Sequence, residues 1–289
     1  MLQQKLQKSF GPIALSAISI FICMIIIQPI ACWMDPTFSL YANRGVGKIG
    51  ITLLVITHIF LLLLAAPKKL WDTFITTNFS FFTSPAWLRS FTTYFGIFFI
   101  AHALFMLGFI PAGAAQINME ALVTITPALA GRLAFGFLAT FFLAWTEELI
   151  FRGTVYPLLA QYLAPLPSAL GASFIFMAAH DLHNPLNLVT VHWRLGLGLF
   201  LLGLLLNLTF ILTKKLYTGM GIHAGLVFVK VVLRRLPLLI FALPHHMPWW
   251  LDQDLRQAPL AQVALGIGCL ILIGILYQSQ QEKNTHRNT

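Results

Sequence analysis

The chain has 289 residues, of which 58% are hydrophobic and only 9% are charged, whereas about a quarter of the residues of an average soluble domain are charged. This composition excludes a soluble globular protein, and at ~20 apolar residues per membrane-spanning helix it allows about eight spans. The net charge of +9 comes from cations that lie singly or in pairs beside apolar runs, which is typical of membrane flanks. We therefore expect a lipid bilayer, and no nucleic acid, as the partner of these cations.

The N-terminus and the cysteines carry no processing or metal signal. The apolar stretch from Phe10 to Ala31 is longer than the ~7 to 15 residues of a signal-peptide core, so we expect a retained first span. The three cysteines, Cys23, Cys32 and Cys269, are too few and too apolar in context for a disulfide framework or a thiolate metal site. We predict no chemistry at these positions.

Apolar runs bounded by charged residues or by proline and glycine follow one another along the chain. They predict an all-α polytopic membrane protein with about eight transmembrane helices in one bundle. The predicted spans cover residues 11–31, 50–66, 91–112, 132–150, 168–180, 196–213, 217–233 and 258–277. No composition shift marks a second domain, so we expect a single membrane domain over residues 1–289 with a polar tail at 278–289.

The distribution of lysine and arginine predicts the orientation of these spans. An even number of spans places both termini on one side of the membrane. With cytoplasmic termini, the inner side carries ten lysines and arginines and the outer side eight, which favours this orientation. We expect an integral, multi-pass protein, in the inner (cytoplasmic) membrane if the source is a bacterium.

Ionisable residues inside a membrane span cost ~2.5 to 3.5 kcal/mol each on insertion scales and mark functional sites. The fourth apolar run leads into three such residues, Glu147, Glu148 and Arg152. Glu148 and Arg152 are four residues apart, so on a helix they share a face and can pair. Glu147 lies ~100° away around the helix. We therefore expect Glu148 to be neutralised locally and Glu147 to be available as a general base.

Two further apolar runs each contain a histidine whose helix face can be predicted from its neighbours. The fifth run ends in Phe176 and His180, which share a helix face. The seventh run contains His223, which lies opposite a face formed by Gly221 and Gly225, and small residues at this spacing permit close helix approach. His58 and His102 stand alone in other spans, and we expect packing roles for them.

These three groups of residues, in the fourth, fifth and seventh apolar runs, resemble the motifs of the CAAX-protease and bacteriocin-processing family of glutamic intramembrane proteases. The motif EExxxR is met by Glu147, Glu148 and Arg152, and the motif FxxxH by Phe176 and His180. The motif HxxxN is met by His223, with Val227 at the asparagine position. The resemblance covers about 90 residues, from the fourth through the seventh span, and predicts a catalytic core at residues 132–230.

The resemblance implies an endopeptidase that cleaves a membrane-embedded or membrane-associated protein or peptide precursor. Glu147 would activate water as the general base with help from His180, and His223 would stabilise the tetrahedral oxyanion. Glu148, Arg152 and Phe176 would support the site, and no cofactor would be needed. Val227 would leave the oxyanion with one hydrogen-bond donor fewer than the family pattern supplies.

Three alternatives remain open at this point. The first is a zinc-dependent variant, in which His180 with His183, or His180 with His223 and Glu147, provides the ligands. The second is a transporter or membrane scaffold that uses the Glu/His/Arg cluster as a proton relay or ion site. The third is an inactive relative of the protease family.

Overall fold

The structure is a computed structural model, and it describes residues 86–123, 126–181, 184–243 and 246–285. All of these residues belong to one compact unit, residues 77–289. The predicted spans 11–31 and 50–66 lie outside the described residues, as do Cys23, Cys32, His58 and His183.

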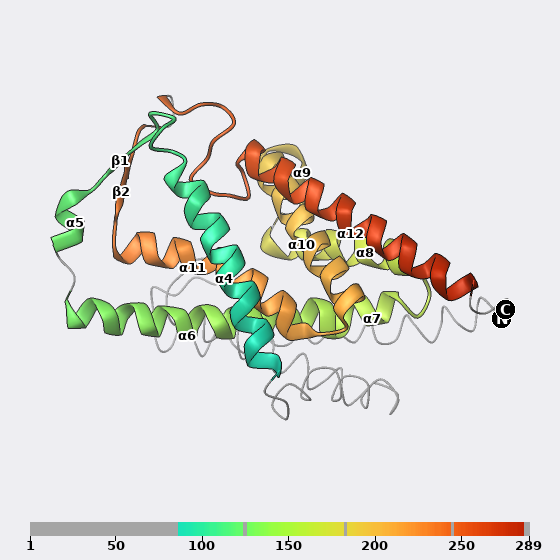
Figure 1. The fold of residues 1–289 in the computed structure, drawn as a ribbon. Helices are drawn as coiled ribbons and strands as arrows, with labels where there is room; N and C mark the ends of the chain where they lie inside the picture. Colours follow the sequence, from blue (N-terminus) through green and yellow to red (C-terminus); the bar gives the residue numbers. More distant parts are fainter. Residues whose placement is uncertain (1–85, 124–125, 182–183, 244–245, 286–289) are drawn as a thin grey trace, which may run out of the picture. The chain divides into compact units, whose positions relative to one another are not determined.

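The described part of the chain is almost entirely helical, as the sequence predicts (Figure 1). Its α-helices are α4 (Ala86–Leu107), α5 (Met119–Val123), α6 (Pro127–Ile150), α7 (Tyr156–Leu159), α8 (Pro165–Ala178), α9 (Asn187–Thr190), α10 (Trp193–Thr213), α11 (Leu216–Arg235) and α12 (Pro259–Thr285). A π-helix (Phe151–Val155) joins α6 to α7, and a short 3₁₀ turn (Ala179–Asp181) follows α8. Two short strands, β1 (Ala115–Ile117) and β2 (Leu239–Phe241), complete the described elements.

Five helices of the described residues are long and apolar enough to cross a membrane. They are α4, the continuous helix Pro127–Leu159, α10, α11 and the segment Pro259–Glu282 of α12. They correspond to the predicted spans 91–112, 132–150, 196–213, 217–233 and 258–277. The total of eight spans stays a prediction for the whole chain.

The predicted fifth span, 168–180, differs from the other five. It corresponds to α8, which begins at Pro165 and has only 14 residues. At 1.5 Å per residue such a helix rises ~21 Å, which is short of the ~30 Å hydrocarbon core of a bilayer. The apolar run is therefore a short helix of the bundle, and it is not one of the five candidate spans.

Local signals explain where several helices begin and end. The Thr126 hydroxyl accepts a hydrogen bond from the Leu129 N–H, and Pro127 occupies the first turn of α6, where its missing N–H costs nothing. Helix α10 ends at Thr213, and the next residue, Lys214, adopts a left-handed conformation with φ of 55°. Only Lys214 and Lys215 separate α10 from α11, so these two helices are antiparallel neighbours.

Helix α11 packs against α4, α6 and α10, while α10 also packs against α8 and α12. A Cβ atom added at Gly221 would lie 2.6 Å from the Phe91 carbonyl oxygen, and one at Gly225 would lie 2.6 Å from that of Phe95. Both contacts are with the backbone of α4, so the predicted glycine face of α11 is the face that approaches α4. Figure 1 shows α4 crossing α11.

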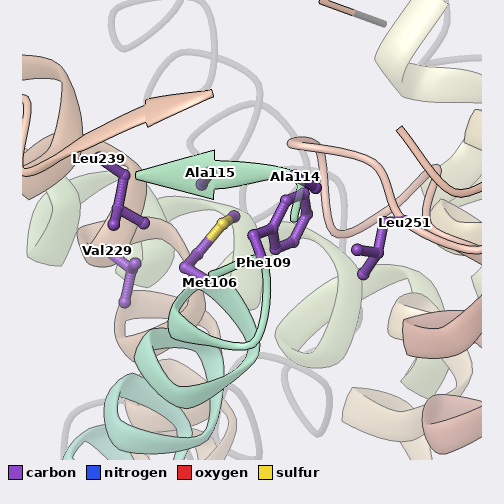
Figure 2. Packing of buried hydrophobic residues seen from close by; sticks show 7 residues of the cluster. All are labelled: Met106, Phe109, Ala114, Ala115, Val229, Leu239 and Leu251. Atoms are coloured by element: carbon purple, nitrogen blue, oxygen red, sulfur yellow. The ribbon is translucent and has the colours of Figure 1, made fainter. Parts of the chain in front are cut away.

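A small ribbon connects the ends of α4 and α11. Strands β1 and β2 are antiparallel, with Ala115 opposite Phe241. The ribbon covers a buried apolar cluster (Figure 2), which consists of Met106, Phe109, Ala114, Ala115, Val229, Leu239 and Leu251. One helix turn away from this cluster, the buried His102 ring hydrogen-bonds through Nδ1 to the Leu226 carbonyl oxygen at 2.7 Å. This contact joins α4 to α11 and agrees with the packing role expected for His102.

Candidate active site

The end of α6 carries a buried ion pair. Arg152 Nη1 donates to Glu148 Oε1 at 3.0 Å, and Arg152 Nη2 donates to the Gly203 carbonyl oxygen of α10, also at 3.0 Å. Both Glu148 and Arg152 are fully buried. The predicted pairing of these residues is present, and the contact with Gly203 ties this helix end to α10.

The π-helix Phe151–Val155 begins three residues after Glu148. The Tyr156 N–H donates to the Phe151 carbonyl oxygen, one residue further than an α-helix allows. Single π-turns of this kind occur frequently at functional sites. The extra residue in this turn has no sequence signal that we recognise.

His223 on α11 lies between the two glutamates. Its Nε2 atom is 3.7 Å from Glu147 Oε2, and its Nδ1 atom is 3.5 Å from Glu148 Oε1. The His223 side chain is buried, whereas the Glu147 side chain is 20% exposed. In the described part of the chain, Glu147 Oε2 and His223 Nδ1 are buried atoms without a hydrogen-bond partner. Of the two glutamates, Glu147 is thus the one whose carboxylate Arg152 does not hold.

Phe176 is the central contact of the site. Its buried ring lies 4.6 Å from the His180 ring and 6.4 Å from the His223 ring, measured between centroids. The guanidinium carbon of Arg152 is 5.0 Å from the centroid of the same ring. One aromatic side chain of α8 therefore contacts residues of all three predicted motifs.

The His180 ring is oriented by its own helix. Its Nδ1 atom hydrogen-bonds to the Phe176 carbonyl oxygen at 2.8 Å. A carbonyl oxygen only accepts, so Nδ1 carries the hydrogen and the lone pair of the neutral ring is on Nε2. The Glu147 carboxylate and the His223 ring both act electrostatically on His180. His180 and His223 thus both lie against Phe176, and Glu147 faces His223, although 76 positions separate Glu147 from His223.

Val227 and the predicted zinc pair contribute less to this arrangement than the residues above. Val227 lies one turn after His223 on α11, is half-buried, and has no polar side-chain atom. In the described residues, no group of three or more His, Cys, Asp or Glu side chains has the arrangement of a metal site. The predicted zinc pair of His180 and His183 includes a residue outside that part of the chain.

Two polar clusters near the site were not predicted. The first joins Asn207 of α10 to Ser173 of α8, with 3.0 Å between Nδ2 and Oγ. An amide inside a long apolar run is the sequence signal that identifies it. The second joins Lys230, Asp254 and Arg256. Lys230 lies seven residues after His223 and therefore on the same helix face. The sequence thus offers a signal for Lys230 but none for Asp254 or Arg256.

Comparison with known proteins agrees with the predicted resemblance. Residues 129–229 match the family model described as type II CAAX prenyl endopeptidase Rce1-like. No curated protein and no solved structure matches the chain. The matched segment runs from α6 into α11, contains all the predicted site residues, and ends before Lys230. This part of the chain therefore carries a domain of a CAAX protease family, and the five apolar helices support an integral membrane protein.

Proposed function

We propose, from this family match, that the protein is a glutamic-type intramembrane endopeptidase in which Glu147 activates a water molecule. The observation that carries the proposal is the difference between two adjacent carboxylates. Glu148 is held by Arg152, whereas Glu147 Oε2 is buried, faces His223 at 3.7 Å, and has no hydrogen-bond partner among the described residues. A buried carboxylate oxygen requires a donor, and a water molecule provides one.

In the proposed reaction, Glu147 takes a proton from water while the lone pair on His180 Nε2 orients the same water. The resulting hydroxide attacks the peptide carbonyl and forms a tetrahedral oxyanion. An N–H of His223 donates to this oxyanion, and the proton held by Glu147 passes to the leaving amine. General base catalysis of this kind contributes ~10² to 10⁴-fold, and one oxyanion donor contributes ~10² to 10³-fold.

Glu148, Arg152 and Phe176 act as supporting residues in this proposal. Arg152 neutralises Glu148 and binds the Gly203 carbonyl of α10, so it keeps the helix end that presents Glu147 in place. Phe176 packs against His180, His223 and Arg152. We assign the catalytic core to residues 132–230 within a single membrane domain, and we place the protein in the inner (cytoplasmic) membrane if its source is a bacterium.

The proposed substrate is a membrane-embedded or membrane-associated protein or peptide precursor. The family that matches residues 129–229 is a protease family, and the candidate spans of the described residues support a site among apolar helices. A substrate of this site must therefore present its peptide bond from the bilayer or its surface.

The test is cleavage of a helical reporter peptide by the full-length protein in detergent or liposomes. Glu147→Gln and His180→Ala should each lower the rate by at least ~10²-fold while the protein still accumulates in the membrane. The matched control is Glu120→Gln, which removes an exposed carboxylate of α5 and should leave the rate unchanged.

Metal chelation separates the proposal from the zinc alternative. If protein groups alone activate the water, the rate should not change on addition of a chelator. Complete loss on chelation with recovery on addition of zinc would replace the glutamic mechanism by a metal-dependent one. If the wild type cleaves no helical peptide while Glu147→Gln alters a cellular phenotype, a transporter, scaffold or inactive relative is the better description.

A further inference from the structure

Asn207 is a fully buried amide inside the apolar helix α10. Its Nδ2 group donates to Ser173 Oγ at 3.0 Å and to the Ala169 carbonyl oxygen at 3.4 Å. Ser173 Oγ itself donates to the Ala169 carbonyl oxygen at 2.6 Å, so this hydroxyl accepts one hydrogen bond and donates another. In the part of the chain that the structure describes, the hydrogen bonds between α10 and α8 all come from this amide.

The helix that Asn207 binds is the one that leads to His180. Ser173 precedes Phe176 by three residues and His180 by seven, which is about one and two helical turns. The Nδ1 atom of His180 hydrogen-bonds to the Phe176 carbonyl oxygen of the same helix. The position of the His180 ring relative to Glu147 therefore follows the position of α8 on α10.

The turn of α10 that contains Asn207 also contacts α6. Gly203 lies one turn before Asn207, and its carbonyl oxygen accepts the hydrogen bond from Arg152 Nη2. A Cβ atom at Gly203 would lie 3.0 Å from the Phe176 ring and 3.3 Å from the Ser173 Cα atom. One turn of α10 thus relates the helix end that presents Glu147 to the helix that leads to His180.

Apolar packing alone defines the register of two such helices poorly. Between membrane helices there is little hydrophobic driving force, because lipid tails are as apolar as the side chains. A hydrogen bond, in contrast, weakens steeply when its length or angle changes. The amide of Asn207 is therefore suited to fix how far α8 lies along α10.

The stability that Asn207 contributes is expected to be small. Its Oδ1 atom is buried without a hydrogen-bond partner among the described residues, and an unsatisfied buried acceptor costs free energy. Ser173 retains its own bond to the Ala169 carbonyl oxygen when Asn207 is replaced. An apolar side chain of the same branched shape would thus leave no donor of α8 unpaired, so positioning and stability can be separated by experiment.

We propose that Asn207 is a positioning residue for the catalytic reaction. Through Ser173 it fixes the register of α8 on α10, and so it holds His180 Nε2 at the distance from Glu147 at which both groups can bind one water molecule. This inference rests on the proposed endopeptidase function and adds a residue that lies outside the three motifs.

The test measures kcat, KM and Tm of the full-length protein with one helical reporter peptide. Asn207→Leu keeps the branched shape of the side chain and removes its donors. We expect kcat to fall at least about tenfold, because misplacement of a catalytic group by ~1 Å can cost ~10²-fold. The substrate contacts are unchanged, so KM should stay within about twofold of the wild-type value. The Tm should not fall.

A second variant and a control assign the effect to the contact with α8. Ser173→Ala removes the acceptor of the amide and should also lower kcat, and the double variant should be no slower than Asn207→Leu alone, because both changes break one hydrogen bond. The control is Thr209→Val on the same helix, whose buried hydroxyl donates to the Leu205 carbonyl oxygen of α10 itself at 2.8 Å. This control should keep the wild-type kcat and KM. Because Ser173→Ala removes a single oxygen atom, it tests the proposal even if Asn207→Leu fails to fold.

The outcomes separate the positioning role from the proposed function. Wild-type kcat in both single variants overturns the positioning role while the endopeptidase stands. A fall in kcat that is matched in both by a fall in Tm also overturns it, because that pattern belongs to a residue that only stabilises the bundle. Absence of cleavage by the wild type contradicts the endopeptidase itself, and the positioning role is then rejected with it.

Discussion

Gly219 on α11 lies directly against the carboxylate of Glu148 on α6. A Cβ atom at position 219 would lie 2.5 Å from Glu148 Oε2 and 3.2 Å from its carboxyl carbon. Glu148 cannot easily move away, because Arg152 holds its other oxygen at 3.0 Å in a fully buried environment. The missing side chain at Gly219, one turn before His223, therefore allows α11 to approach α6 closely enough for His223 to reach both glutamates.

This contact predicts that Gly219→Ala disturbs the site through Glu148. Overpacking a buried contact costs ~1 to 3 kcal/mol, and a displaced Glu148 carries its neighbour Glu147 with it. We expect at least about a tenfold loss of cleavage, since ~1.4 kcal/mol is a factor of ten. The control is Gly266→Ala on α12, where a Cβ would meet nothing within 4 Å. Full activity of Gly219→Ala would show that the close contact is unimportant.

The sequence predicts the parts of this arrangement that follow from helix periodicity. The Glu148–Arg152 pair, the shared face of Phe176 and His180, and the glycine face of α11 all depend on residues three or four apart on one helix. Such relationships are independent of how the helices are placed relative to one another. The order of the residues along each helix is therefore enough to predict them.

The ends of α8 and the contacts between helices were not predicted. The short length of α8 depends on its start at Pro165 and its change to a 3₁₀ turn at Ala179, and an apolar run does not reveal either point. The π-helix after Ile150 accompanies a contact between Arg152 and α10. Arg256 approaches His180 only because the loop before α12 folds against Gly198, more than 70 positions away from His180 in the chain.

Glu148→Gln should destabilise the protein, whereas Glu147→Gln should not. Glu148 is the partner of a fully buried Arg152, and removing one member of a buried ion pair costs ~3 to 5 kcal/mol. Glu147 is partly exposed and is not paired with Arg152. Thermal unfolding in detergent should therefore show a much lower Tm for Glu148→Gln only.

A double variant checks the cause of this effect. Replacing both members of a buried pair by uncharged residues is often neutral, so Glu148→Gln combined with Arg152→Met should regain much of the lost stability. If the double variant is less stable than Glu148→Gln alone, the bond from Arg152 to Gly203 contributes more than the ion pair.

Reporter fusions at Leu255 and Thr289 should report opposite sides of the membrane. The segment Pro259–Glu282 between them has 24 residues and is apolar enough to cross a membrane, and at 1.5 Å per residue it rises ~36 Å, which exceeds the thickness of the hydrocarbon core. With cytoplasmic termini, Thr289 is inside and Leu255 outside. Reports from the same side would mean that α12 does not cross and that the topology must be redrawn.

The ion pairs of Asp254 should stabilise the protein down to low pH. Burial raises the pKa of Asp254, but the hydrogen bonds and charges of Arg256 and Lys230 outweigh it and hold the pKa well below its ordinary value. A carboxylate with a lowered folded-state pKa contributes stability above its unfolded pKa of ~3.9, and this contribution is lost as the pH falls through the folded value.

Asp254→Asn removes this contribution and serves as the comparison. The difference in Tm between the wild type and Asp254→Asn should be constant from about pH 8 to about pH 5 and should narrow only below about pH 4. The measurement is thermal unfolding of both proteins in the same detergent across this range. A difference that already narrows between about pH 7 and about pH 5 would assign the effect to another group.

Val227 is where the chain departs from the motif that it otherwise resembles, and it provides the sharpest probe of the oxyanion. Val227 is half-buried, lies one turn after His223, and has no donor to offer. If His223 is the donor, Val227→Ala should lower cleavage only modestly through packing, while His223→Ala should lower it by at least ~10²-fold. Val227→Asn adds an amide at the position where the motif has one, so its rate should equal or exceed that of the wild type. The measurement is kcat/KM on one helical reporter peptide for all four proteins. A strong loss in Val227→Asn with full accumulation would show that the pocket beside His223 is adapted to an apolar side chain, and that the oxyanion must lie elsewhere.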